Sequence, residues 1–223
     1  MTTPKALIIG ASRGIGLGLA TTLADRGWQV TATTRKDTPD SAASIHWLTL
    51  DINLAEQREA LVAELAGQQF DVVFINAGVY GPEHQTLSRT RDEELMALFM
   101  TNTFSPLRCA EALLPQVKPR SGILALMTSQ LASLNENPDA TYPLYAASKG
   151  ALNMLARGLS AKTDALGQTL LCVHPGWVQT DMGGKNAPLT VAQSAAGIAD
   201  QLVAWRGKGG HHYIDYSGKS LAW

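Results

Sequence analysis

The sequence lacks the features that would point to a membrane, a nucleic acid or a secretory route. None of its apolar runs approaches the roughly 20 residues that span a bilayer. Its formal net charge is only -1, so there is no excess of positive charge to bind nucleic acid or an anionic membrane. The first residues, MTTPKALIIG, lead from an apolar run into a glycine motif and not into a signal-peptide cleavage site. We therefore expect a cytoplasmic protein with no nucleic-acid and no membrane partner.

Cysteine is also scarce. The two cysteines, Cys109 and Cys172, lie far apart, and neither has neighbours at a metal-ligand spacing. We expect both to be buried thiols in a reducing compartment. His211 and His212 are adjacent in an expected strand, so their side chains point to opposite faces and cannot bind one metal ion together. The sequence predicts no metal site.

The chain has 223 residues, 45% of them hydrophobic, which suffices for one sizeable core and not for two. No linker, repeat or low-complexity tract divides it. Seven strands are expected, at residues 5–9, 28–34, 46–50, 71–75, 123–127, 169–173 and 211–214. Their regular alternation with helices is typical of a parallel sheet covered on both faces. We predict an α/β fold with one domain over residues 1–223: a doubly wound Rossmann fold with a seven-stranded parallel sheet.

Helical patterns connect these strands. They are expected at about residues 15–26, 54–66, 91–117, 145–165 and 190–205. The third of them is expected to be bent or interrupted near Pro106. The last begins at Thr190 with Gln193 three residues later, which is the pattern of a capping box.

A glycine motif, GASRGIG at residues 10–16, separates the first strand from the first helix. We expect one glycine to let the chain turn off the strand and another to let the backbone approach a pyrophosphate. The last lets the helix pack closely on the strand, with the helix N-terminus facing the phosphates. The motif predicts dinucleotide contacts at Gly10, Ser12, Arg13, Gly14, Ile15 and Gly16.

The end of the second strand is where such a fold selects its dinucleotide. An acidic residue there would bond the ribose 2′-hydroxyl of NAD, whereas an arginine can receive the 2′-phosphate of NADP. The chain has TTRK at residues 33–36 and no acid until Asp37. Arg35 is the candidate, and Arg13 offers a second positive group. We favour NADP(H) over NAD(H); the alternative is that Arg35 and Lys36 are a solvated loop pair.

Other strand ends carry further candidate contacts to the cofactor. After the third strand come Asp51, whose carboxylate is well placed to accept from an adenine amino group, and Ile52. Small residues at the end of the fourth strand let a cofactor lie close to the backbone, and these are Asn76, Ala77 and Gly78. A Pro-Gly turn with a polar rim follows the sixth strand and offers contacts to a nicotinamide carboxamide, at Pro175, Gly176, Val178 and Thr180.

Tyr145 and Lys149 lie four residues apart in an expected helix, so both side chains leave the same face. A cation about 4 Å from a phenol, at an effective dielectric near 20, is worth about 4 kcal/mol, or up to about 3 pKa units. We therefore expect Lys149 to lower the pKa of Tyr145 toward a range useful for general acid catalysis. Ser129 lies past the end of the fifth strand, on the side where open α/β sheets bind ligands. The Tyr-Lys spacing alone is also typical of an ordinary amphipathic helix.

Together these motifs resemble the short-chain dehydrogenase/reductase family over nearly the full chain. The resemblance rests on GASRGIG at 10–16, NAG at 76–78, Asn102, Ser129, Tyr145 with Lys149, and PGWVQT at 175–180. The runs ASKGALNM after Tyr145 and HPGWVQTDMGG at 174–184, with the Trp-terminated tail, resemble the C-factor-like and sniffer-like carbonyl reductases in particular.

The resemblance implies a reaction in which hydride passes from NADPH to a carbonyl while Tyr145 protonates the oxygen. It implies that Lys149 lowers the phenol pKa and binds the nicotinamide ribose, that Ser129 holds the substrate oxygen, and that Asn102 anchors a water linking Lys149 to solvent. It also suggests a homodimer or homotetramer on helices 91–117 and 145–165. Close helix contact there would be permitted by small residues, namely Ala146, Ala147, Gly150 and Ala151.

The chain departs from the family pattern in three places. Ile75 stands where an asparagine is usual, and Ser129 precedes Tyr145 by sixteen residues, longer than in many relatives. The intervening loop is expected to shape the pocket, and Ser133 is a rival hydroxyl. The segment after Met182 is short, which predicts an open pocket with broad acceptance of small carbonyl compounds. Candidate wall residues, for which plain packing is the alternative, are Val79, Tyr80, Gln130, Leu131, Tyr142, Trp177 and Met182.

Three functions remain open. The first is an NADPH-dependent reductase of ketones, aldehydes or quinones. The second is a cofactor-binding sensor or signalling protein that has lost turnover, although such a protein would be expected to lack the tyrosine or lysine. The third is an alcohol dehydrogenase that works in the oxidative direction. The same residues serve both directions, so only the expected cofactor favours reduction.

Overall fold

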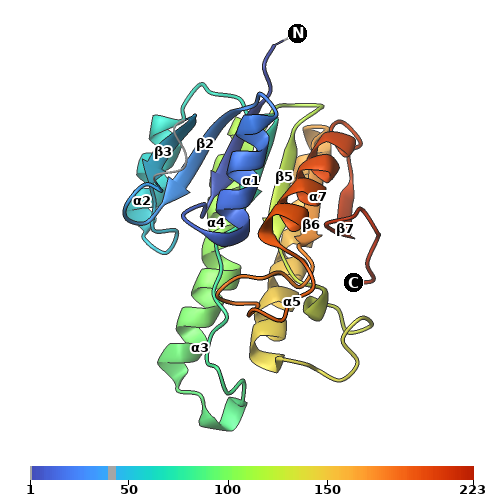
Figure 1. Cartoon of the computed structure of the whole chain (residues 1–223). Coiled ribbons are helices and arrows are strands. Elements are labelled where there is room, and N and C mark those ends of the chain that lie inside the picture. Colours follow the sequence, from blue (N-terminus) through green and yellow to red (C-terminus); the bar gives the residue numbers. More distant parts are fainter. Residues whose placement is uncertain (1, 40–43) are drawn as a thin grey trace.

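The computed structural model describes residues 2–39 and 44–223 and contains one seven-stranded sheet (Figure 1). Its strands are β1 (Lys5–Ile9), β2 (Gln29–Thr34), β3 (Ile45–Thr49), β4 (Val72–Ile75), β5 (Ile123–Met127), β6 (Thr169–His174) and β7 (His211–Asp215). Every neighbouring pair is parallel, in the order β3-β2-β1-β4-β5-β6-β7. The predicted doubly wound α/β Rossmann fold is therefore confirmed.

Helices cover both faces of this sheet. On one face, α1 (Gly14–Asp25) and α7 (Val191–Ala204) bury Leu19, Leu23 and Ile198 against the strands. The opposite face is covered by α2 (Ala55–Glu64), α4 (Ser105–Leu113) and α5 (Pro143–Arg157). Because both faces are covered, β4 and β5 are buried along their whole length.

The strand order reverses between β1 and β4, which is where open α/β sheets leave a crevice at their carboxyl edge. The strands end at the lower edge of the sheet in Figure 1, and α3 (Asp92–Phe99) and the first turns of α5 extend beyond it. These projecting helices give the carboxyl edge of the sheet side walls.

The helix expected at 91–117 is interrupted, as predicted, but by a π-helical turn, η2 (Met100–Phe104), between α3 and α4. Pro106 has no N–H, so the carbonyl of Asn102 cannot receive the usual α-helical hydrogen bond from that residue. Immediately before the proline, the backbone N–H of Ser105 donates to the carbonyl of Met100, five residues earlier, which is the π-helical pattern. A 3-10 turn, η3 (Leu114–Gln116), ends the segment.

The expectation of one long helix over 145–165 was wrong, because two helices occupy it, α5 and α6 (Ser160–Ala165). The backbone N–H groups of Gly158 and Leu159 bond three residues back, to Leu155 at 3.0 Å and Ala156 at 2.9 Å. This tightened turn ends α5 and buries the Leu159 side chain. In contrast, the capping box of α7 is present as predicted.

Cys109 and Cys172 are free and buried, as predicted. The rings of His211 and His212 stack on different partners, Trp223 and Trp205, which confirms that they point to opposite faces. Within residues 2–39 and 44–223, no cluster of three metal-ligating side chains was found. No helix in the same ranges is long and apolar enough to cross a membrane.

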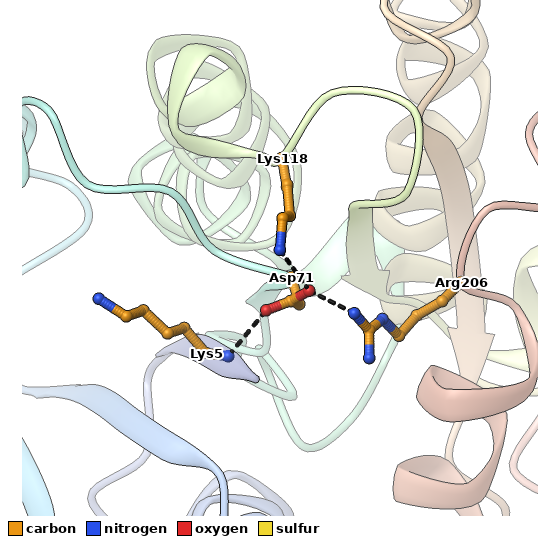
Figure 2. A network of polar contacts seen from close by, with 4 residues as sticks. All are labelled: Lys5, Asp71, Lys118 and Arg206. Carbon is orange, nitrogen blue, oxygen red and sulfur yellow. Dashed lines mark hydrogen bonds and ion pairs between the residues drawn. The ribbon is translucent and has the colours of Figure 1, made fainter. Parts of the chain in front are cut away.

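Asp71 joins four elements at the amino edge of the sheet (Figure 2). Asp71 directly precedes β4, and its side chain is only 5% exposed. The carboxylate accepts a hydrogen bond from the backbone N–H of Lys5 in β1 at 2.9 Å. It also pairs with Lys118, before β5, at 3.3 Å and with Arg206, after α7. This network lies at the edge of the sheet opposite the candidate site. A substitution in it should therefore change stability without changing the site directly.

We expect Asp71→Asn to lower the free energy of unfolding by about 2–3 kcal/mol, because it leaves Lys118 and Arg206 without their counter-ion. Chemical denaturation of both proteins measures the change. Asp200→Asn is the matched control, since Asp200 pairs with Arg26 while 64% exposed and its loss should cost under about 1 kcal/mol. Equal effects of the two substitutions would show that the buried network contributes no more than a surface ion pair.

Candidate active site

A cleft of about 470 Å³, here the glycine-motif cleft, runs along the carboxyl edge of the sheet. It contains most of the predicted cofactor residues: Gly10, Ser12, Arg13, Gly14, Ile15, Arg35, Asp51, Ile52, Asn76, Ala77, Gly78, Tyr145, Lys149, Pro175 and Thr180. Gly16, Gly176 and Val178 do not line this cleft. Residues from many strand ends therefore meet in one groove.

The glycines of the motif have the geometry that close approach requires. Gly10 has a φ of +85°, and a Cβ there would lie 2.9 Å from backbone atoms of Ala77. A Cβ at Gly16 would lie 2.3 Å from the carbonyl oxygen of Gly10 and 2.5 Å from Nδ2 of Asn76. The Asn76 amide in turn donates to the Gly10 carbonyl at 2.6 Å. Gly16 thus acts by packing α1 against β1 and β4, which explains why it is absent from the cleft wall.

The N-terminus of α1 is suited to an anion. Among the described residues, no side chain caps its first N–H groups, and its first turn has no acidic residue. The partial positive charge there is therefore not neutralised by the helix itself. Arg35 lines the same cleft and is exposed, while Arg13, 73% exposed, pairs with Asp181 across it. These residues fit a dinucleotide with one phosphate group at the N-terminus of α1 and another near Arg35 and Arg13.

Tyr145 and Lys149 face one another as the helical spacing predicts. The Lys149 Nζ lies 6.0 Å from the centroid of the Tyr145 ring and donates to the carbonyl of Met127 at 2.9 Å. Lys149 is only 2% exposed. This burial lowers the pKa of Lys149 to about 8.

The expected lowering of the Tyr145 pKa is absent from this structure. Burial raises the pKa of Tyr145 to about 12, and a hydrogen bond with Ser129 only partly opposes this effect. The nearby Tyr80 raises it further. The reason for the difference is that burial disfavours the charged form of the phenol, and that the Lys149 ammonium is itself desolvated. The phenol is therefore a proton donor over the whole neutral range.

Ser129 follows β5 and begins a short 3-10 turn, η4 (Gln130–Ala132). Its hydroxyl accepts from the N–H of Leu131 at 3.2 Å, and its carbonyl accepts from the hydroxyl of Tyr213 in β7. The rival Ser133 is buried, accepts from the N–H groups of Asn135 and Glu136, and lines neither cleft. Ser129 is therefore the hydroxyl beside Tyr145.

The Asn102 side chain is fully engaged within the protein. Its amide oxygen accepts from the N–H of Val79 at 2.8 Å, and its amide nitrogen donates to the carbonyl of the same residue at 2.8 Å. It also donates to the hydroxyl of Ser148 at 3.0 Å. Asn102 thus holds the segment after β4 against α5. A relay water would have to be held by its main-chain carbonyl, which Pro106 leaves without the α-helical bond.

A second cleft of about 500 Å³, here the tyrosine cleft, adjoins the first at Tyr145, which lines both. Its walls include six of the seven predicted substrate residues, namely Tyr80, Gln130, Leu131, Tyr142, Trp177 and Met182. The seventh, Val79, lines the glycine-motif cleft instead. The Tyr80 ring lies 5.5 Å from the Tyr142 ring and 5.9 Å from the Tyr145 ring.

A family model for short chain dehydrogenases matches residues 4–189. The chain belongs to this family. It is 40% identical to a carbonyl reductase from Pseudomonas aeruginosa in complex with NADP, with a TM-score of 0.91 and 100% of both chains covered. The carbonyl reductase Sniffer of D. melanogaster is 31% identical, with a TM-score of 0.88 and 100% of both chains covered.

The C-signal protein of Myxococcus xanthus is 35% identical over 156 residues, which cover 69% of this chain and 92% of that protein. With Sniffer, it confirms the predicted resemblance to the C-factor-like and sniffer-like branch.

Several residues of the candidate site were not predicted from the sequence. Gln85, with a φ of +49°, accepts from the N–H of Tyr145 at 2.9 Å and donates to the carbonyls of Pro82 and Tyr80. It thereby holds the Tyr80 segment against α5. His174 and Glu136 line the tyrosine cleft. His174 directly precedes the Pro-Gly turn, and Glu136 lies in the long loop that was expected to shape the pocket. Their positions in the sequence could therefore have indicated that both line the cleft.

Proposed function

We propose that the protein is an NADPH-dependent carbonyl reductase that acts on a ketone, aldehyde or quinone group of a small molecule. The observation that carries the proposal is the position of Tyr145, which lines both clefts and has Lys149 and Ser129 beside it. A dinucleotide in the glycine-motif cleft and a substrate in the tyrosine cleft would therefore meet at its hydroxyl. The carbonyl reductase activity named for two relatives supports the same assignment.

The glycine-motif cleft would hold the cofactor through its named residues. The N-terminus of α1 binds the pyrophosphate, Arg35 with Arg13 binds the 2′-phosphate, and Asp51 lies at the adenine end. Bound there, the reduced nicotinamide supplies the hydride. The preference for NADP(H) rests on Arg35 and on the NADP bound to the Pseudomonas aeruginosa relative.

In this proposal, three side chains act on the carbonyl oxygen. Ser129 holds it by a hydrogen bond, and Tyr145 donates the phenolic proton to it. The Lys149 ammonium, on the same side of α5, stabilises the negative charge of the resulting phenolate. Asn102 holds the loop after β4 next to α5, the helix that carries Lys149, through its two hydrogen bonds to Val79.

The protein is proposed to assemble as a homodimer or homotetramer. Large apolar side chains are exposed on the expected helices, with Met96 61%, Met154 66% and Leu155 44% exposed. Ala146 is buried, and a Cβ at Gly150 would meet the chain's own Ala132 carbonyl at 3.3 Å. These two small residues therefore serve internal packing, and the exposed methionines are the better candidates for contact between subunits.

NADPH oxidation measured with a panel of ketones, aldehydes and quinones between pH 6 and 10 tests this function. We expect turnover below about pH 8 and a fall approaching tenfold per pH unit above it. Lys149 loses its charge as the pH rises through its pKa of about 8, whereas Tyr145 stays protonated up to about 12. Tight NADPH binding without turnover on any compound would instead favour a sensor.

A further inference from the structure

The loop between η4 and α5 carries a carboxylate into the tyrosine cleft. Ser133 accepts from the backbone N–H groups of Asn135 at 3.2 Å and Glu136 at 3.1 Å, and Asn137 donates to the carbonyl of Leu131 at 3.2 Å. These bonds tie the loop to the turn that follows Ser129. The half-buried Glu136 side chain lines the cleft as a result.

This carboxylate has no cationic partner in the part of the chain that the structure describes. Its two contacts are the amide of Gln130 at 3.3 Å and the backbone N–H of Ala222 at 3.4 Å, both long and both uncharged. None of the ion pairs formed by the described residues includes it. A partly desolvated carboxylate with weak partners gains free energy from a cation that enters beside it.

The rest of the cleft also favours positive charge. No lysine or arginine is among the described residues that line it. Burial lowers the pKa of His174 to about 4, so this imidazole is neutral at pH 7 and does not offset the carboxylate. Aromatic rings attract cations through their faces, and Tyr80, Tyr142 and Trp177 all line the same cleft.

We propose that the tyrosine cleft selects carbonyl substrates that carry a positively charged ammonium group, with Glu136 as the residue that binds this cation. The reacting carbonyl lies at Tyr145 and Ser129, while the cation lies at Glu136 among the aromatic rings. Gln130, which directly follows Ser129 and contacts Glu136, spans the wall between the two ends. This inference rests on the proposed reductase function and adds a substrate class to it.

The test compares two aldehydes of nearly equal shape, 4-(trimethylammonio)benzaldehyde and 4-tert-butylbenzaldehyde, in the wild type and Glu136→Gln at saturating NADPH. We expect Glu136→Gln to lower kcat/KM about tenfold for the cationic aldehyde and less than twofold for the neutral one, because the ionic attraction between the carboxylate and the ammonium group is lost. Comparing each aldehyde between the two proteins cancels their different intrinsic reactivities. Asp139→Asn, an exposed carboxylate of the same loop outside the cleft wall, is the control and should change neither value.

An equal loss for both aldehydes would overturn the proposal, since Glu136 would then only maintain the loop. No loss for either would overturn it as well. A binding measurement separates this inference from the reductase function: by calorimetry, benzyltrimethylammonium should bind the wild type about tenfold more tightly than Glu136→Gln. Equal affinity refutes the ammonium site even if aldehydes are reduced, and unequal affinity without any turnover refutes the reductase alone.

Discussion

Tyr145→Phe is expected to lower kcat for carbonyl reduction by about 10³-fold, while the dissociation constant of NADPH changes less than threefold. The substitution removes the only atom of the side chain that can donate a proton, and general acid catalysis typically contributes about 10²–10⁴-fold. The ring is retained, so its packing against Tyr80 at 5.9 Å is preserved. Stopped-flow or steady-state NADPH oxidation, with fluorescence titration of NADPH, measures both quantities.

Tyr142→Phe is the matched control, because Tyr142 also lines the tyrosine cleft but does not line the glycine-motif cleft. It should retain at least about a third of the activity. If Tyr145→Phe kept more than a tenth of the wild-type kcat, another group would have to supply the proton. His174 and Ser129, which line the same cleft, would be the next residues to replace.

Arg35→Ala is expected to weaken NADPH binding about 30-fold and to leave NADH binding within a factor of two. Arg35 lines the glycine-motif cleft and makes no ion pair with other described residues, so its guanidinium is available to a phosphate. A hydrogen bond to a charged group is worth about 1.5–3 kcal/mol, which corresponds to about 10–150-fold in affinity. Titration with each dinucleotide gives the two constants.

Lys36→Ala provides the comparison, because Lys36 is the neighbouring exposed cation and does not line the cleft. An equal effect of the two substitutions would mean that only general positive charge is sensed. A parallel loss of NADH and NADPH affinity would show that Arg35 does not contact the 2′-phosphate. Arg13 should contribute less than Arg35, since its guanidinium is already paired with Asp181.

Much of the fold was predictable because its signals are local. The predicted strands agree with the observed ones to within about one residue at each end, since buried parallel strands are short apolar runs bounded by turn residues. The capping box at Thr190 and Gln193 depends on only four residues and was correct. The break at Gly158 was missed, because what ends α5 is the burial of Leu159, which no local pattern records.

For the candidate site, the sequence predicted which strand ends meet at one edge of the sheet, but not the electrostatics there. The glycine motif, Asn76 and Ser129 all follow parallel strands, so a correct strand assignment is enough to place them at one edge. The proton affinities of Tyr145 and Lys149 depend instead on how much water β5, η2 and η4 exclude. That exclusion reversed the expected direction for Tyr145.

The amino-acid sequence by itself determined the alternation of strands and helices, the dinucleotide motif and the Tyr-Lys pair. Hydrophobic periodicity and residue spacing are properties of the linear chain. Only the tertiary structure decided which side chains share a cleft and which are consumed in packing. Asn102 is bonded at both of its amide atoms to Val79, and Ser133 holds a loop. Glu136 lines the tyrosine cleft and forms no ion pair with the other described residues. These outcomes depend on contacts between residues far apart in sequence, so burial and hydrogen-bond partners appear only once the chain is folded.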